Sequence, residues 1–144
     1  MNYVNFVLNN LKNLGGCKMT GKQAEQFVSG FLSARGAWVG EFKKGVNGTQ
    51  PFDLIIIDQK YTICADVKHC KTNRFDFDRI EENQEQALSF IDGLGNKRVK
   101  CGVLVVYEAE IYYVSHSAIK LAQLEGKKSV TVTDLKKIRD KVEF

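Results

Sequence analysis

The sequence predicts a single α/β or α+β domain in which a mixed central β-sheet is flanked by helices. The first observation is hydrophobic periodicity, which changes along the chain in the order helix, three strands, helix, two strands, helix. The second is size and composition. The 144 residues, 44% hydrophobic and 26% charged, suffice for one core and are too apolar for a disordered chain. No internal repeat, low-complexity segment or linker divides the sequence, so residues 1–144 are expected to form one domain.

The N-terminal residues 2–13 are expected to form a short helix with apolar side chains near one face, which Gly15 and Gly16 end. The segment has neither a basic start nor a cleavage site, so it does not read as a signal peptide. We expect residues 1–16 to pack on the domain or on a second subunit, as a dimerisation arm.

A second helix is expected to begin at Thr20, because Gln23 follows three residues later as in a capping box. Gly36 provides its C-terminal stop. Glu25 flanks the apolar stripe of this helix, and the pattern alone is that of a solvated surface glutamate. The stripe consists of Ala24, Phe27, Val28, Phe31 and Leu32.

Three strands are expected next, over residues 37–44, 52–57 and 61–67. The first alternates in polarity, with Trp38 as a core or edge residue and Glu41 as an acid expected on the surface. The other two are apolar runs joined by a short polar turn. Such runs suit strands that are covered on both faces.

Three charged residues interrupt these two apolar strands. Because alternate residues of a strand share a face, Asp66 and Lys68 project together, and hairpin pairing can bring Asp53 beside Asp66. Two adjacent carboxylates repel unless a cation lies between them, and such oxygen ligands suit Mg²⁺. A nearby lysine can hold or deprotonate a water. The alternative is an ordinary hairpin whose acids are solvated at the strand ends.

The pattern Pro51-Phe52-Asp53, twelve residues, then Asp66-Val67-Lys68 resembles the PD-(D/E)XK nuclease superfamily. Within it, residues 21–90 are similar to Holliday-junction resolvases, both the archaeal type and the recombination nuclease of Gram-positive bacteria and their phages. The resemblance implies a restriction-endonuclease-like fold with its catalytic core within residues 20–91. The sequence departs from the resolvases in two ways. Phe52 separates proline from aspartate, as it also does in the Gram-positive type, and Asp66 stands where resolvases usually carry glutamate.

The resemblance also implies roles for the residues of this motif. Asp53 and Asp66 are the expected metal ligands, together with the carbonyl oxygen of Val67. Lys68 is expected to position or activate the nucleophilic water. The implied cofactor is Mg²⁺, and Mn²⁺ is expected to substitute for it.

Two further residues match the resolvases. Glu25 matches the glutamate of their first helix and would assist the metal directly or through water. Gln84 matches the glutamine of their later helix, expected here over residues 79–91 with Asp78 as its cap, and would orient the attacking water or contact phosphate. A lone glutamine on a helix is otherwise simply solvated. His69 is a minor candidate for a general acid.

Basic residues near the motif are candidates for DNA contacts. In the irregular segment 69–78 they lie close to Phe75 and Phe77, a combination that suits contacts to the DNA backbone and to exposed bases. The alternative is a surface loop that the two phenylalanines anchor. The candidate DNA-binding residues are Lys43, Lys44, Lys71 and Arg74.

The C-terminal half is expected to add two strands, over residues 99–107 and 110–114, joined by a tight turn. Ser117 can cap a helix that runs to Leu124. The remaining expected elements are an edge strand over residues 127–132 and a last basic helix capped by Thr133 or Asp134. The basic face of that helix is solvated or extends the DNA footprint.

The four cysteines form no C-x-x-C pair and the chain has only two histidines, which argues against a structural zinc site. Cys64 and Cys101 fall in apolar strands and read as small core residues. No apolar run approaches the roughly 20 residues that span a bilayer. Reduced thiols in the cytoplasm, or in a host cytoplasm for a viral protein, are therefore the expectation.

Together these observations predict a Mg²⁺-dependent DNA endonuclease that resolves Holliday junctions by paired nicking as a homodimer. The net charge of +4 is compatible with a DNA partner. One alternative is another nuclease of the same superfamily, acting in restriction, repair or recombination. The other is a DNA-binding protein of the same fold without catalysis, against which the intact Asp53, Asp66 and Lys68 argue.

Overall fold

The computed structural model describes residues 19–42, 50–139 and 144. The expected N-terminal helix over residues 2–13, and with it the arm of residues 1–16, lies outside the described residues, as do Lys43 and Lys44. Within the described part of the chain, no helix is both long and apolar enough to cross a membrane.

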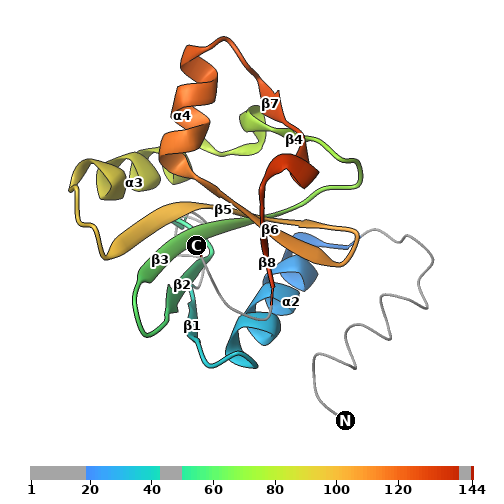
Figure 1. The fold of residues 1–144 in the computed structure, drawn as a ribbon, viewed down its shortest axis with the longest axis vertical. Helices are drawn as coiled ribbons and strands as arrows, with labels where there is room; N and C mark the ends of the chain where they lie inside the picture. Colours follow the sequence, from blue (N-terminus) through green and yellow to red (C-terminus); the bar gives the residue numbers. More distant parts are fainter. Residues whose placement is uncertain (1–18, 43–49, 140–143) are drawn as a thin grey trace.

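A six-stranded mixed sheet forms the centre of the fold (Figure 1). Its spatial order is β1-β2-β3-β5-β6-β8, in which β3 and β5 are parallel and every other neighbouring pair is antiparallel. The predicted mixed central sheet is therefore confirmed. The strands are β1 (Trp38–Glu41), β2 (Leu54–Ile57), β3 (Thr62–His69), β5 (Val99–Tyr107), β6 (Glu110–Ser115) and β8 (Lys136–Ile138).

Helices cover both faces of this sheet. Helix α2 (Gly21–Ser33) packs on one face, and α3 (Glu82–Gly93) and α4 (His116–Leu124) lie on the other (Figure 1). Alternation along β3 divides its side chains between the two layers, so that Ile63, Ala65 and Val67 join the core beneath α2. Cys64 instead packs with residues of α3. By the same alternation, Asp66 and Lys68 belong to the α3 face.

The predicted hairpin of the second and third strands is confirmed. Leu54 pairs with Ala65 and Ile57 with Thr62 in antiparallel register. The turn is closed by Asp58, whose Oδ1 accepts hydrogen bonds from the backbone N–H groups of Lys60 at 2.7 Å and Tyr61 at 2.6 Å. The start of β2 and the end of β3 therefore lie at the same edge of the sheet.

A small second sheet lies in the region predicted to be irregular. Strand β4 (Phe75–Asp76) pairs with β7 (Ser129–Val130), and a 3₁₀ turn over Phe77–Arg79 follows β4. Asn73 fixes the preceding loop, because its side chain bonds both the hydroxyl and the backbone N–H of Thr133, at 2.8 and 2.9 Å. The segment from 69 to 78 is thus more ordered than its composition suggests.

The predicted last helix is wrong. Residues Lys136–Ile138 form β8, which extends the main sheet, and another 3₁₀ turn covers Val132–Asp134. Ile138 pairs with Ile111 and is only 1% exposed. A basic segment with one large apolar side chain at the right register can complete a sheet edge. Burial of Ile138 stabilises the strand more than the helix-compatible pattern of the segment favours a helix.

The predicted helix starts were partly wrong as well. The capping box at Thr20 is confirmed, with both reciprocal hydrogen bonds present. Helix α3 begins at Glu82 with Glu81 as its cap rather than Asp78, because the 3₁₀ turn takes up the residues before it. Helix α4 is capped by Ser115, whose Oγ accepts from the N–H of Ala118, and not by Ser117.

The sequence left open whether Trp38 is a core or an edge residue, and the structure shows an edge residue. It lies on the terminal strand β1 and is 61% exposed. Gly36, the predicted end of α2, has a φ of 89° that glycine adopts without strain.

Candidate active site

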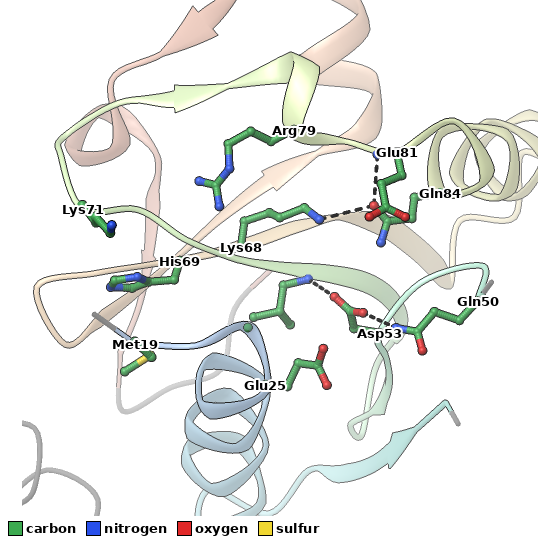
Figure 2. Close-up of a pocket in the computed structure, with 12 residues that line it drawn as sticks. Met19, Glu25, Gln50, Asp53, Lys68, His69, Lys71, Arg79, Glu81 and Gln84 are labelled. Carbon is green, nitrogen blue, oxygen red and sulfur yellow. Dashed lines mark hydrogen bonds between the residues drawn. The ribbon is translucent and has the colours of Figure 1, made fainter. Parts of the chain in front are cut away.

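A cavity of about 460 Å³ opens where β2 begins and β3 ends. Its walls come from the start of α2, the segment before β2, the end of β3 and the start of α3. Figure 2 shows Glu25, Asp53, Lys68 and Gln84 around it. Four of the five side chains predicted to be catalytic therefore line one cavity, and the fifth, Asp66, lies directly behind its wall.

Asp53 is held in place by two hydrogen bonds. Its Oδ2 accepts from the backbone N–H of Val67 at 2.7 Å, and its Oδ1 accepts from Nε2 of Gln50 (Figure 2). The backbone N–H of Asp53 in turn donates to the carbonyl of Ala65, which continues the hairpin ladder by one residue. This places Asp53 next to Asp66, as the sequence predicted.

Asp66 is fully buried on β3. Its Oδ1 accepts from Nε2 of Gln84 at 2.6 Å, and its Oδ2 lies 3.0 Å from Nζ of Lys68. The approach of this ammonium does not have hydrogen-bond geometry, so Oδ2 is a buried oxygen without a hydrogen-bond partner. Burial, followed by the contact with Asp53, raises the pKa of Asp66 to about 8 despite the neighbouring lysine.

Glu25 extends the pair to three carboxyl groups. It projects from α2 toward Asp53 (Figure 2). Burial, then the charge and hydrogen bond of Asp53, and finally the charge of Glu41 raise the pKa of Glu25 to about 7. Asp53 thus interacts with both Glu25 and Asp66. Glu41 is itself exposed, as predicted, although it contributes to this negative field.

This arrangement suits a hard divalent cation. Asp53 interacts with both Glu25 and Asp66, and ionising all three acids is unfavourable. The raised pKa values of Glu25 and Asp66 reflect burial first and the interaction with Asp53 second. The oxygen donors match the ligands that Mg²⁺ prefers. One of them is the buried Oδ2 of Asp66, which pairs with Lys68 but accepts no hydrogen bond. The residues present therefore fit the predicted metal.

Gln84 and Lys68 connect the acids to α3. Oε1 of Gln84 accepts from the backbone N–H of Glu81 at 3.1 Å, as part of the cap of α3, and lies 3.4 Å from Nζ of Lys68. Gln84 is only 4% exposed, so the alternative of a solvated glutamine is wrong. Both ends of its amide are engaged, which makes it a link between the start of the helix and Asp66.

Cationic side chains lie across the cavity from the acids. Figure 2 shows Lys71, His69 and Arg79 on the side opposite Asp53. Burial and the charges of Arg79 and Lys71 lower the pKa of His69, which favours a neutral imidazole and weakens the case for a general acid.

Arg74, a predicted DNA contact, does not line this cavity and pairs with Asp76 at 2.6 Å. Phe75 and Phe77 are buried, at 0% and 5% exposure, so they anchor the loop and are not free to stack on bases. The alternative of a phenylalanine-anchored loop is the one that the structure supports.

Sequence reasoning missed several residues of the cavity, among them Gln50, Arg79 and Glu81. Gln50 sits beside the motif proline, but a polar residue in a turn carries no distinguishing pattern. Arg79 was placed at a helix start, whereas the 3₁₀ turn carries it to the cavity, where its Nη1 donates to Sγ of Cys70 at 3.3 Å.

Of the comparisons with known proteins, only the one with solved structures gives a match. No family model matches the sequence, and no curated protein matches it either. Among solved structures, the chain is similar to Hjc from Archaeoglobus fulgidus, a Holliday junction resolvase from an archaeal hyperthermophile, at a TM-score of 0.52. The match has 17% sequence identity and covers 67% of this chain and 78% of Hjc. The chain therefore has the restriction-endonuclease-like fold of a resolvase, as its sequence resemblance predicts.

Proposed function

We propose that this protein is a Mg²⁺-dependent, structure-selective DNA endonuclease that resolves Holliday junctions. The observation that carries the proposal is the contact of Asp53 with both Glu25 and Asp66, with Lys68 3.0 Å from Asp66. Side chains from α2, from the start of β2 and from β3 converge there, and buried acids at such a density are typical of metal-dependent hydrolysis.

Each residue has a role in this proposal. Asp53 and Asp66 hold the metal, with the carbonyl oxygen of Val67, and Glu25 assists directly or through a water. When bound, Mg²⁺ neutralises the charge of the phosphate and makes a bound water more acidic, and Mn²⁺ substitutes for it. Lys68 holds the attacking water in line with the phosphorus.

Gln84 acts on this site in the proposal by orienting Asp66 rather than by touching the substrate. Its amide has one hydrogen bond to Asp66 and one from the helix cap. Lys71 and Arg79 neutralise the phosphates that flank the scissile bond, because both line the side of the cavity opposite the acids.

A four-way junction is the substrate that we propose. The support is the fold shared with Hjc, a Holliday junction resolvase, together with the motif resemblance. A junction has near two-fold symmetry, so a homodimer would cut paired strands symmetrically. Residues 1–16 are the proposed dimerisation arm, and the cytoplasm, of a host where the source is viral, is the proposed location.

The two alternatives make different predictions in one assay. Matched four-way junction, linear duplex and single-stranded DNA are incubated with the protein, with Mg²⁺ and with a chelator, and with Asp66→Asn as the inactive control. Preferential, symmetric, Mg²⁺-dependent nicking of the junction supports the proposal. Equal cutting of all three would assign the chain to another nuclease type, and tight binding without cutting would make it a DNA-binding protein.

A further inference from the structure

A second cluster of ligand-type side chains lies away from the proposed catalytic cavity. Asp92 in the last turn of α3, Cys101 on β5 and His116 at the start of α4 each offer one ligand atom, and all three atoms lie within 4.8 Å of one another. Cys101 and His116 are buried, whereas Asp92 is exposed. None of the three lines the catalytic cavity.

Both ring nitrogens of His116 face carboxylates. Nε2 lies 3.1 Å from Oε1 of Glu85, and Nδ1 lies 3.1 Å from Oδ2 of Asp92. A neutral imidazole donates from only one nitrogen, so one contact would set a lone pair against a carboxylate. Three arrangements relieve this: a second proton on the ring, a proton on one of the two carboxyl groups, or a metal ion between Nδ1 and Asp92.

The surroundings of His116 match those of a metal-binding histidine. Such a histidine generally donates its other nitrogen to a carboxylate, which fixes the tautomer. Glu85 is placed for that role, and Lys120 in turn pairs with Glu85. Asp92 and His116 are already close to the roughly 3.3 Å that separates two ligands of a tetrahedral zinc ion.

Cys101 supplies the third donor. Its Sγ donates to the carbonyl of Leu88 at 3.4 Å, and burial, with Asp92 close by, raises the pKa of this thiol to about 12 when no cation is present. A metal binding here would therefore release the thiol proton. Sulfur, imidazole nitrogen and carboxylate together select Zn²⁺ over Mg²⁺, which prefers oxygen alone.

The cluster borders a cavity that is separate from the proposed catalytic one. This second cavity, of about 550 Å³, is lined by Asp92 and Cys101 and shares no residue with the catalytic cavity. Tyr113, Ser115 and Ser117 also line it. The Tyr113 hydroxyl donates to the carbonyl of Cys101, and the two serine hydroxyls bond each other. The cavity gives a cation a route of entry and room for a water as the fourth ligand.

We propose that Asp92, Cys101 and His116 form a Zn²⁺ site that ties α3, β5 and α4 together on one face of the sheet. Glu85, which positions His116, follows Gln84 in α3, and Gln84 bonds Asp66. The cation would therefore stabilise the helix whose first turn contacts Asp66. The inference is independent of the proposed nuclease activity.

Cobalt titration tests the site directly. The full chain is stripped with a chelator and titrated with Co²⁺ in excess Mg²⁺, which keeps the oxygen-ligand site filled. The expected result is a thiolate-to-cobalt charge-transfer absorption that Zn²⁺ abolishes and that Cys101→Ser removes. Cys17→Ser, Cys64→Ser and Cys70→Ser are the matched controls and should retain it. Absence of the absorption, or its persistence in Cys101→Ser, would overturn the proposal.

A second measurement covers the case in which Cys101→Ser fails to fold. Asp92 is exposed, so Asp92→Asn should keep its structure, as circular dichroism can verify. In excess Mg²⁺, which keeps the oxygen-ligand site filled, Zn²⁺ should raise the melting temperature of the stripped wild-type chain and of Asp58→Asn, but not that of Asp92→Asn. An equal rise of the melting temperature in all three proteins would contradict the proposed site. So would nitrogen NMR that shows a doubly protonated His116 unchanged by Zn²⁺. Neither readout depends on DNA cleavage.

Discussion

The side-chain amide of Gln84 donates to Oδ1 of Asp66 at 2.6 Å while its oxygen accepts from the N–H of Glu81 at 3.1 Å. One residue thus caps α3 and fixes the orientation of a buried acid on β3. Through this link, a helix outside the hairpin holds the orientation of Asp66, one of the proposed metal ligands.

Gln84→Ala should therefore reduce DNA cleavage by about 10-fold or more and destabilise the fold by about 1–3 kcal/mol, since it leaves a buried Oδ1 without its donor. Junction affinity should change little. Gln86→Ala is the matched control, because Gln86 is exposed on the same helix and reaches only Glu82, at 3.4 Å. If both variants lose activity equally, the link has no catalytic role.

The stability of the metal-free protein should fall as pH rises. The fold raises the pKa of Asp66 to about 8, so it favours the protonated acid. The stabilisation is complete below the unfolded pKa of roughly 4 and is lost as pH rises through about 8, on the order of a few kcal/mol at about 1.4 kcal/mol per pKa unit. Chemical denaturation in the presence of a chelator, repeated at a series of pH values, measures the slope of the unfolding free energy against pH.

Two comparisons isolate the cause of that slope. Asp66→Asn should reduce the slope and leave the part due to Glu25, whose pKa is also raised, whereas Asp78→Asn at an exposed position should leave the slope unchanged. Saturating Mg²⁺ should also flatten it and stabilise the protein most at alkaline pH, because the cation favours ionised acids. A slope in Asp66→Asn as steep as that of the wild-type chain would assign the pH dependence to other groups.

Lys68 can be tested apart from binding. Its side chain is 15% exposed and its Nζ lies between Asp66 and Gln84. Lys68→Gln should lower the cleavage rate by about 10²–10⁴-fold, the usual range for a group that moves or holds a proton. The Kd for the junction should change far less, which binding in Ca²⁺ and single-turnover cleavage in Mg²⁺ can separate. A parallel loss of affinity and rate would instead make Lys68 a phosphate contact.

The sequence predicted the clustering of Asp53, Asp66 and Lys68 well because this clustering depends on one short hairpin. Period-2 geometry places Asp66 and Lys68 on one face, and the antiparallel register then brings Asp53 alongside. The position of the Glu25 side chain was harder to predict. A residue beside an apolar helical stripe can face either solvent or another acid, and the packing of α2 against β3 decides which. The family resemblance supplied what the helical pattern lacked.

The errors have a common origin in long-range contacts. Residues 136–138 carry a basic, helix-compatible sequence, yet pairing with β6 and burial of Ile138 make them a strand. In the same way, Arg79 reaches the cavity only because Phe75 and Phe77 bury themselves and a tight turn follows them. Cys101, Asp92 and His116 have no linear spacing that would mark them, since three separate elements bring them together.

The cationic side of the cavity yields a final prediction. Lys71 and Arg79 line it, whereas Arg74 lies outside and is held by Asp76. Lys71→Ala and Arg79→Ala should each weaken junction binding and lower the slope of log affinity against log salt by about one, as loss of one phosphate contact does. Arg74→Ala should change the slope less.

Lys127→Ala provides the control for overall charge, because Lys127 is exposed beyond α4 and pairs with Glu125. Fluorescence anisotropy of a labelled four-way junction at several salt concentrations, without cleavage-supporting metal, measures all four variants on one scale. Equal slopes for Lys71→Ala, Arg79→Ala and Lys127→Ala would mean that junction binding depends only on the net charge of the protein. A lower slope for the first two variants alone would indicate that the phosphate backbone passes Lys68 on the side of Lys71 and Arg79.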